Sequence, residues 1–373
     1  MRIAFLCKRR YMGKDVVLDR YGRLYEIPWQ LAARGHEVLG LCLSYHADAD
    51  AAWQHESPAG SLRWRSRRVG GLRLPRLASA AAWMLGELRD FAPERVIGAS
   101  DILHVALAAR CARRLRVPFA ADLYDDFESF GMARIPGARR ALRSAVREAA
   151  LVSCTSEALA AHVRDDYRAH GRVVSLPSTV DLQVFRAGDR AASRGALGLP
   201  ADALLVGTAG HLAADRGIAT VYEGFRRLRE ACPRLHLVLA GPADAALPPP
   251  RDERVHYLGR LDHAQVATLF SALDLGVIYL RDTPFGRYCF PQKAYEMAAC
   301  GLPFIAADVG AMRPLLAATP GHLYTADDTQ SLVRAMRHAL EHPAPPPPVP
   351  QDWSALVATL DAELAACAAA DPR

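Results

Sequence analysis

Short apolar runs alternate with segments of helical periodicity along most of this chain. The first run, residues 1–7, is followed by a polar loop over 8–19, a helical pattern over 21–34 and a second apolar run over 36–43. Short apolar runs separated by helices are typical of β-α-β units, whose strands are parallel and buried. The pattern therefore predicts an α/β fold.

This alternation continues to about residue 176 and begins afresh near residue 203. In the first series the expected strands and helices are 78–91 (helix), 95–98 (strand), 102–114 (helix), 118–123 (strand), 136–149 (helix), 151–155 (strand) and 173–176 (strand). In the second series they are 203–209 (strand), 217–230 (helix), 235–240 (strand), 255–258 (strand), 263–272 (helix), 275–279 (strand), 290–301 (helix) and 304–307 (strand). Two series predict two Rossmann-like domains, over residues 1–185 and 201–342, joined by a polar linker over 186–200.

Two further segments lie outside this alternation. Residues 50–76 are basic and rich in Trp, Gly and Pro, and we expect them to be irregular. Residues 343–373 begin with a proline-rich stretch, which predicts an extended connector. Apolar residues then recur at helical spacing from Trp353 onward, so we expect a final helix that packs back on the first domain.

Composition places the chain among soluble globular proteins. Its 373 residues contain no apolar run near the roughly 20 residues that a membrane-spanning helix needs, and its start reads as a strand instead of a signal peptide. We therefore expect a cytoplasmic protein. The eight cysteines are scattered without a C-x-x-C pair, so reduced core thiols are expected and a metal site is not.

Positive charge is concentrated in the first half. Residues 1–180 contain 28 Lys and Arg against 19 Asp and Glu, a net charge of +9, whereas the remainder carries −3. Arginine clusters at residues 63–76 and 134–147 can face an anionic membrane, including the inner face of a cell membrane, or a phosphorylated acceptor. A solvated basic face is the alternative. No nucleic-acid-binding motif accompanies the arginines, so nucleic acid is not an expected partner.

The most informative stretch is residues 290–309, FPQKAYEMAACGLPFIAADV. Pro291 suits the first turn of a helix, Lys293 and Glu296 fall on one face of it, and Gly301 ends it. A cation and a carboxylate near a helix start suit a ligand that carries both phosphate and hydroxyl groups, such as a nucleotide sugar. The alternative is an ordinary amphipathic helix with exposed charges.

A second group of polar residues follows the strand expected at 118–123. The sequence DLYDDFESFG places Asp122, Asp125, Asp126 and Glu128 at a strand's carboxyl end, where ligands bind in open α/β sheets. These carboxylates are candidate bases or hydroxyl binders, and helix capping explains one or two of them equally well. The first loop holds one glycine, Gly13, so the G-x-G-x-x-G fingerprint of nicotinamide binding is absent.

Several segments in a fixed order resemble retaining GT-B glycosyltransferases of the group 1, family 4 type. GRLYEIPWQLAARGHEV, CTSEALAAHV and STVDLQVF are similar to elements of their first domain. GTAGHLAADRGIATVYEGFRRL, LHLVLAGP and RVHYLGRLDHAQVATLFSALDLGVI resemble elements of their second domain, and KAYEMAACGLPFIAADVG resembles their most specific motif. The resemblance covers most of the chain and implies two domains that face each other across a cleft.

The resemblance also implies roles for individual residues. Glu296 would bind the donor ribose, Arg216 the diphosphate, and the backbone at Gly259 and Arg260 the nucleobase. The chain departs from the family at Tyr288, which replaces a second glutamate. Two further departures are His211, in place of the family's arginine, and Tyr124, in place of a histidine. The donor-side candidates also include His211, Tyr288, Gly13, Gly241 and Pro291, and the candidate catalytic groups are Arg216, Lys293 and Asp125. The candidates on the acceptor side are Tyr124, Asp126 and His104.

These assignments predict a metal-independent hexosyltransferase that needs no cofactor. It would move a sugar from a nucleoside diphosphate, with UDP favoured over GDP, to a hydroxyl of a glycan, a lipid-linked molecule or a small molecule, with retention of configuration. Two alternatives remain at this point. One is a nucleotide-sugar epimerase of the same fold, and the other is a non-catalytic scaffold that binds nucleotide sugar.

Overall fold

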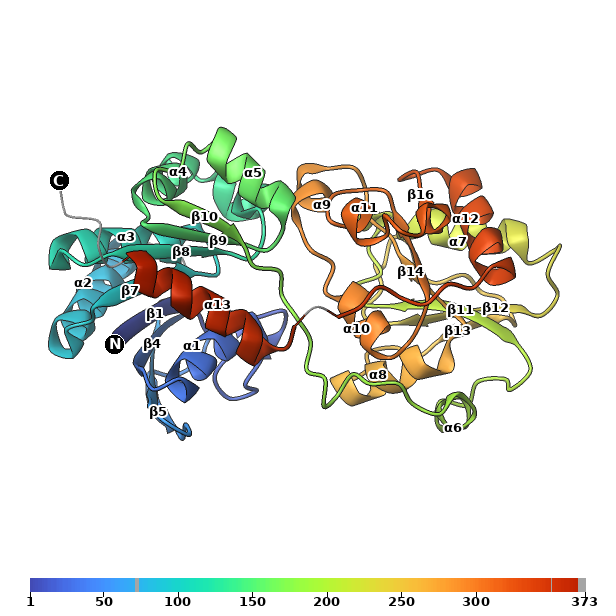
Figure 1. The fold of residues 1–373 in the computed structure, drawn as a ribbon, viewed down its shortest axis with the longest axis horizontal. Helices are drawn as coiled ribbons and strands as arrows, with labels where there is room; N and C mark the ends of the chain where they lie inside the picture. The colour runs from blue at the N-terminus through green and yellow to red at the C-terminus, as the bar shows by residue number, and fades with distance from the viewer. Residues whose placement is uncertain (71–73, 350, 368–373) are drawn as a thin grey trace. The chain divides into compact units, whose positions relative to one another are not determined.

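The computed structural model describes residues 1–70, 74–349 and 351–367. It divides into two compact units, each with helices packed on a sheet of mainly parallel strands (Figure 1). The first unit contains residues 1–178 together with the described chain from Trp353, and the second contains Thr179–Asp352. The two Rossmann-like folds predicted from the sequence are therefore present.

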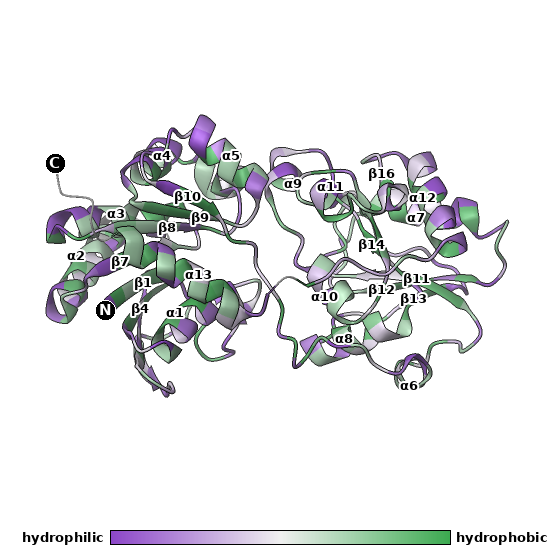
Figure 2. Ribbon diagram, in the orientation of Figure 1, coloured by the Kyte–Doolittle hydropathy of each residue, from purple (hydrophilic) through white to green (hydrophobic). Residues whose placement is uncertain are grey.

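The first unit is built on an eight-stranded sheet. Its strand order is β10-β9-β8-β7-β1-β4-β6-β5, and all neighbouring pairs are parallel except β5 with β6. The strands are β1 (Arg2–Lys8), β4 (Glu37–Ser44), β5 (Ala51–His55), β6 (Ser61–Arg68), β7 (Arg95–Ala99), β8 (Phe119–Leu123), β9 (Leu151–Cys154) and β10 (Arg172–Ser175). The helices are α1 (Arg23–Ala33), α2 (Leu74–Phe91), α3 (Ile102–Leu115), α4 (Ala138–Glu148), α5 (Glu157–Asp165) and, from the end of the chain, α13 (Trp353–Ala366). Figure 2 shows the central strands of this sheet as hydrophobic, as expected for strands covered on both faces.

The segment expected to be irregular, residues 50–76, instead contains β5 and β6 and the start of α2. Its residues 71–73 lie outside the described residues. In β6 the buried Leu62 and Trp64 alternate with the exposed Arg63 and Arg65, which is the period of two of a strand. The expectation was wrong because Arg63 and Arg65 lie on one face of β6, while Leu62, Trp64 and Ser66 are buried on the other.

The second unit is built on a six-stranded parallel sheet with the order β13-β12-β11-β14-β15-β16. Its strands are β11 (Leu204–Ala209), β12 (Leu235–Ala240), β13 (Val255–Tyr257), β14 (Leu275–Ile278), β15 (Phe304–Ala307) and β16 (Leu323–Tyr324). Its helices are α6 (Arg190–Ala196), α7 (Ile218–Leu228), α8 (His263–Ala272), α9 (Pro284–Tyr288), α10 (Lys293–Ala299), α11 (Met312–Leu315) and α12 (Thr329–Glu341), with a short 3-10 turn η3 (Ala214–Arg216).

Residues 186–200, expected as a linker, belong to the second unit and include α6. Arg194 of α6 forms an ion pair with Asp274, with 2.7 Å between Nη2 and Oδ2. Its guanidinium also donates to the carbonyls of Ala272 and Ala203. Arg194 thus ties α6 to the neighbouring α8 and β11 regions, whereas Arg186, Asp189 and Arg190 are exposed.

The final helix α13 packs on α1 of the first unit, as the sequence predicted. Trp353, Leu356 and Leu360 are buried in the core that α1 shares with the sheet. Asp361 accepts hydrogen bonds from Arg34 and from Nε2 of His36, each at 2.8 Å. The first unit is therefore completed by the last helix of the chain.

Candidate functional site

Three glycines bring the loops after β11, β12 and β13 into contact. Gly210, Gly241 and Gly259 follow these strands and have φ angles of +120°, +115° and +67°, which favour glycine. The amide of Gly241 donates to the carbonyl of Gly259 at 2.6 Å. A Cβ atom on Gly241 would lie 2.0 Å from the carbonyl oxygen of Gly210, so no side chain fits there. The carboxyl edge of this sheet is therefore lined by backbone atoms, at the place where ligands bind in open α/β sheets. We call the backbone at Gly210, Gly241 and Gly259 the glycine shelf.

Lys293 extends over this shelf from the first residue of α10. Its Nζ lies 4.7 Å from the centroid of the Tyr279 ring, a cation-π distance. The same atom is 3.3 Å from the position that a Cβ atom on Gly210 would take. Tyr279 is fixed in turn because its hydroxyl donates to the carbonyl of His211 at 2.8 Å. Burial lowers the pKa of Lys293 to about 8, with Glu296 acting against this shift.

Arg216 brings a second cation to the same edge. It ends the turn η3, and its Cζ lies 4.4 Å from the centroid of the Phe285 ring of α9. Its charge is one of the causes that lower the pKa of Lys293, so the two cations are close enough to repel. Among the residues that the structure describes, neither forms an ion pair with a carboxylate. Two cations at one sheet edge without a carboxylate partner in the described structure can bind an anion with two charged groups.

Glu296 lies one turn beyond Lys293 on α10, on the same face. Burial raises its pKa to about 7, and the charge of Lys293 opposes this shift. Both side chains keep some exposure to solvent, so they remain accessible to a ligand. A carboxylate at this position can accept hydrogen bonds from hydroxyl groups.

The other donor-side candidates lie around this group. Pro291 precedes α10, which spans only Lys293–Ala299 and begins two residues later than the expected first turn. Tyr288 ends α9 and is half-buried. Arg260 is exposed beside Gly259, and His211 contributes its backbone carbonyl to Tyr279.

On the acceptor side, the acidic cluster after β8 separates into different roles. Asp122 is buried in an ion pair with Arg23, with 2.6 Å between Oδ1 and Nη2. Asp126 caps the 3-10 turn η1 (Phe127–Ser129) by accepting from the amide of Glu128. Glu128 pairs with Arg143 of α4 at 2.6 Å. Capping therefore explains Asp126, and the half-buried Asp125 accepts from the amide of Asp126 at 3.0 Å.

Tyr124 and His104 are held by neighbours in the first unit. The hydroxyl of Tyr124 donates to the carbonyl of Ser100 at 2.8 Å. His104 is fully buried in the first turn of α3, and its Nδ1 lies 2.8 Å from Oδ1 of Asp101, the helix N-cap. The Nε2 atom of His104 has no hydrogen-bond partner in the described structure. Tyr124 keeps a partly exposed side chain, whereas the side chain of His104 is fully buried. A ligand can therefore reach Tyr124 but not His104.

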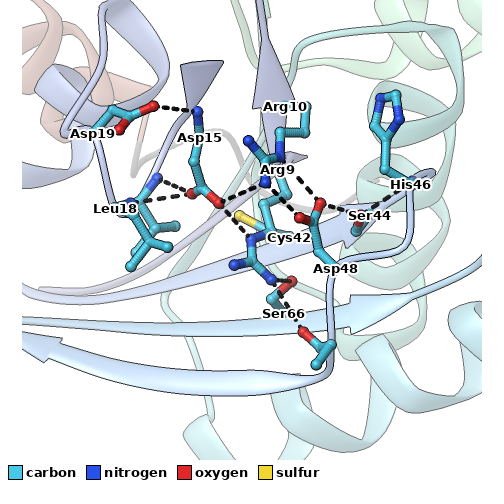
Figure 3. A network of polar contacts seen from close by, with 12 residues as sticks. Arg9, Arg10, Asp15, Leu18, Asp19, Cys42, Ser44, His46, Asp48 and Ser66 are labelled. Carbon is cyan, nitrogen blue, oxygen red and sulfur yellow. Dashed lines mark hydrogen bonds and ion pairs between the residues drawn. The ribbon is translucent and has the colours of Figure 1, made fainter. Parts of the chain in front are cut away.

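Gly13, expected on the donor side, lies at the tip of a hairpin formed by β2 (Arg10–Tyr11) and β3 (Lys14–Asp15). Its φ of +80° is required by the turn, and no atom lies within 4 Å of the position that its Cβ would take. Figure 3 shows how carboxylates hold the base of this hairpin. Asp15 accepts from Arg9 at 2.9 Å, and Asp48 pairs with Arg10 at 2.5 Å. The hairpin is therefore fixed on the sheet although its tip is exposed.

Sequence reasoning missed the aromatic residues that support these cations. The ring of Tyr279 packs against the ammonium of Lys293, and the ring of Phe285 packs against the guanidinium of Arg216. In the first unit, Tyr11 lies beside Tyr124 with 5.0 Å between ring centroids. One signal was available for Tyr279, because it directly follows β14 at the same edge as Gly210 and Gly241. No comparable signal marks Phe285, since only the fold brings it to Arg216.

Family models match both units. One described as "Glycosyl transferases group 1" matches residues 203–342, and one described as "Glycosyl transferase 4-like domain" matches residues 24–179. A D-inositol 3-phosphate glycosyltransferase of Stackebrandtia nassauensis is 31% identical over 253 residues, which are 63% of this chain and 53% of that protein. The Mycobacterium bovis protein of that name is 36% identical over 145 residues, 36% of this chain and 28% of that protein. The chain thus spans about half the length of these curated relatives or less.

Solved structures share the fold over nearly the whole chain. Sucrose-phosphate synthase from Thermosynechococcus elongatus superposes with a TM-score of 0.70 at 19% identity, covering 99% of this chain and 96% of that one. HepE of Anabaena in complex with UDP-glucose gives 0.67 at 18% identity, covering 99% and 98%. Together with the two family models, these findings show that the chain belongs to the GT-B glycosyltransferases of the group 1, family 4 type.

Proposed function

We propose that this protein transfers a sugar from a nucleoside diphosphate, with UDP favoured, to a hydroxyl group of an acceptor, with retention of configuration. Two cations carry the proposal, namely Lys293 above the glycine shelf and Arg216 on the ring of Phe285, neither of which has an ion-pair partner among the described residues. A diphosphate offers two charged groups to two such cations. UDP-glucose in the HepE structure and the inositol phosphate in the name of the Stackebrandtia and Mycobacterium relatives agree with this choice of substrates.

In the proposed reaction, negative charge develops on the diphosphate as its bond to the sugar breaks. Lys293 and Arg216 stabilise that charge by fixed electrostatic interaction, so no metal ion is required. Glu296 binds donor hydroxyl groups, and the backbone at Gly241, Gly259 and the adjacent Arg260 borders the nucleobase. In the first unit, Asp125 and Tyr124 bind the acceptor.

Nucleotide binding tests the donor part of this proposal. We expect UDP at 100 times its dissociation constant to raise the free energy of unfolding by about 2.7 kcal/mol, because a ligand that binds only the folded state stabilises it. Differential scanning fluorimetry with UDP, GDP, CMP and dTDP measures this effect. Lys293→Met should lose most of the stabilisation and Lys14→Met, at the exposed hairpin tip, should keep it. If none of the four nucleotides stabilised the wild type, the proposal would be wrong.

The pH dependence of catalysis is expected to be bell-shaped. With pKa values of about 7 for Glu296 and about 8 for Lys293, kcat/KM should rise as the carboxylate ionises and fall as the ammonium loses its proton. Glu296→Gln should remove the acidic limb of a profile measured from pH 5 to 10. An unchanged acidic limb in this variant would exclude Glu296 as its source.

The raised pKa of Glu296 also predicts how the free energy of unfolding depends on pH. Since the folded pKa of Glu296 lies above the ordinary value of 4.5, ionising it opposes folding. Its contribution to the free energy of unfolding therefore falls as the pH rises from about 4.5 to about 7, and chemical denaturation of Glu296→Gln should lack this fall.

The acceptor remains a glycan, a lipid-linked molecule or a small molecule in this proposal. Helix α4 exposes Arg139, Arg140 and Arg147, next to the exposed Ile135, and this basic face suits a peripheral contact with an anionic membrane. Among the described helices, none is both long and apolar enough to cross a bilayer. In the other arginine cluster, Arg65 pairs with Glu87 at 2.7 Å and Arg67 donates to the hydroxyl of Ser79 at 3.0 Å.

A further inference from the structure

The chain uses lysine rarely, and its lysines stand in particular places. Of its 46 basic residues only three are lysines, namely Lys8, Lys14 and Lys293. Lys14 lies at the exposed tip of the hairpin, and Lys293 lies at the carboxyl edge of the second sheet. Lys8 ends β1 and so occupies the carboxyl edge of the first sheet. An ammonium is a compact point charge, unlike the planar arginine fork, so these two edges carry a distinct kind of cation.

Aromatic rings frame Lys8 as they frame Lys293. Its Nζ lies 5.3 Å from the ring centroid of Tyr11 and 5.8 Å from that of Tyr124. Cation-π contacts at these distances satisfy none of the three N-H donors of the ammonium. Burial lowers the pKa of Lys8.

No carboxylate in the described chain pairs directly with this ammonium. Asp101 lies nearby, but one of its oxygens accepts from the backbone amide and Nδ1 of His104 and the other accepts from the hydroxyl of Tyr45. Asp125 acts on Lys8 from beyond ion-pair distance. The donors of Lys8 are therefore open to a ligand, while the charges of Asp101 and Asp125 act against the lowering of its pKa by burial.

The surroundings of Lys8 are rigid and include backbone strain. Ser100 has a φ of +82°, a left-handed value that costs a non-glycine residue free energy. Its hydroxyl accepts from the amide of Lys8 at 2.9 Å, and its carbonyl accepts from Tyr124 at 2.8 Å. Tyr11 belongs to the hairpin whose base Asp15 and Asp48 fix (Figure 3). The fold thus positions both rings and the lysine in advance, as a binding site requires.

We propose that Lys8, framed by Tyr11 and Tyr124, binds a phosphate group of the acceptor. A phosphate offers several acceptor oxygens to the three donors of the ammonium, whereas a neutral hydroxyl offers one. Calling the ligand an acceptor rests on the proposed function, but the presence of the anion site does not. The phosphate belongs either to a phosphorylated sugar or to a phosphorylated lipid.

Because there are only three lysines, the site can be observed directly in the full-length protein. Labelling lysine with ¹³C at Cε gives three signals, which Lys8→Met, Lys14→Met and Lys293→Met assign. Adding inorganic phosphate should shift the Lys8 signal saturably and raise its pKa, and sodium chloride at equal ionic strength should not. Lys14 is the internal control for general screening. A Lys8 signal that ignores phosphate, or follows Lys14, overturns the proposal.

Variants at position 8 separate charge from structure. Lys8→Met should weaken phosphate binding, followed by ³¹P line broadening in a Lys293→Met background, at least about 10-fold, since hydrogen bonds to charged groups have about this effect. Lys8→Arg should retain most of the binding, and equal loss in both variants would overturn the proposal. Glucose 6-phosphate and dodecyl phosphate then identify the source of the phosphate by which of them shifts Lys8 at the lower concentration. Failure of the proposed function would appear elsewhere, as a Lys293 signal that UDP does not shift.

Discussion

Replacing Lys293 by alanine should lower turnover by about 10²- to 10³-fold, equivalent to about 2.7–4 kcal/mol of activation free energy. The reason is the position of its ammonium, which Tyr279 holds above the glycine shelf with no carboxylate paired to it in the described structure. Charge that develops on the leaving diphosphate meets this cation in the transition state. Release of nucleoside diphosphate under saturating donor measures the effect.

The control for this variant is Lys14→Ala, which removes the same charge from the exposed hairpin tip and should leave turnover unchanged. Lys293→Arg retains the charge, but the larger guanidinium must fit between Tyr279 and Gly210. This space is narrow, because a Cβ atom added to Gly210 would already lie 3.3 Å from Nζ of Lys293. We therefore expect only partial recovery. Full turnover in Lys293→Ala would remove this residue from the mechanism, and release of free epimerised donor would favour an epimerase.

Most of the strands, though not β5 and β6, and the main cation and carboxylate of the candidate site could be predicted because both depend on local sequence. Apolar runs identify buried strands, and Lys293 and Glu296 share a helix face through their spacing alone. The aromatic supports could not be predicted in this way. Tyr279 reaches Lys293, and Phe285 reaches Arg216, only after strands and helices far apart in the sequence have packed.

The acidic residues after β8 show the same limit. Asp122 and Asp125 look equivalent in the sequence, since both are carboxylates at a strand's carboxyl end. Asp122 is buried within β8, one residue before its end, and Arg23 from the start of α1 forms an ion pair with it there. Its role follows from a partner 99 residues away, which no local pattern indicates.

Replacing Asp122 by alanine should lower the free energy of unfolding of the first unit by about 3–5 kcal/mol, because it leaves the buried Arg23 guanidinium without its counter-ion. The side chains of Arg23 and Asp122 are only 2% and 1% exposed. Ser153 also donates to Asp122 at 2.6 Å, and Arg23 donates to the carbonyl of Leu176 at 2.6 Å, so the pair joins α1 to β8, β9 and the end of β10.

Urea denaturation followed by tryptophan fluorescence measures this loss selectively, because all five tryptophans belong to the first unit. The matched control is Glu148→Ala, which removes one partner of the exposed pair with Arg113 and should cost less than about 1 kcal/mol. In the double variant Arg23→Met with Asp122→Leu, most of the stability should return, since apolar side chains can replace a buried pair without leaving a charge unpaired. If Asp122→Ala cost no more than the surface control, the pair would not be what ties α1 to the carboxyl edge of this sheet.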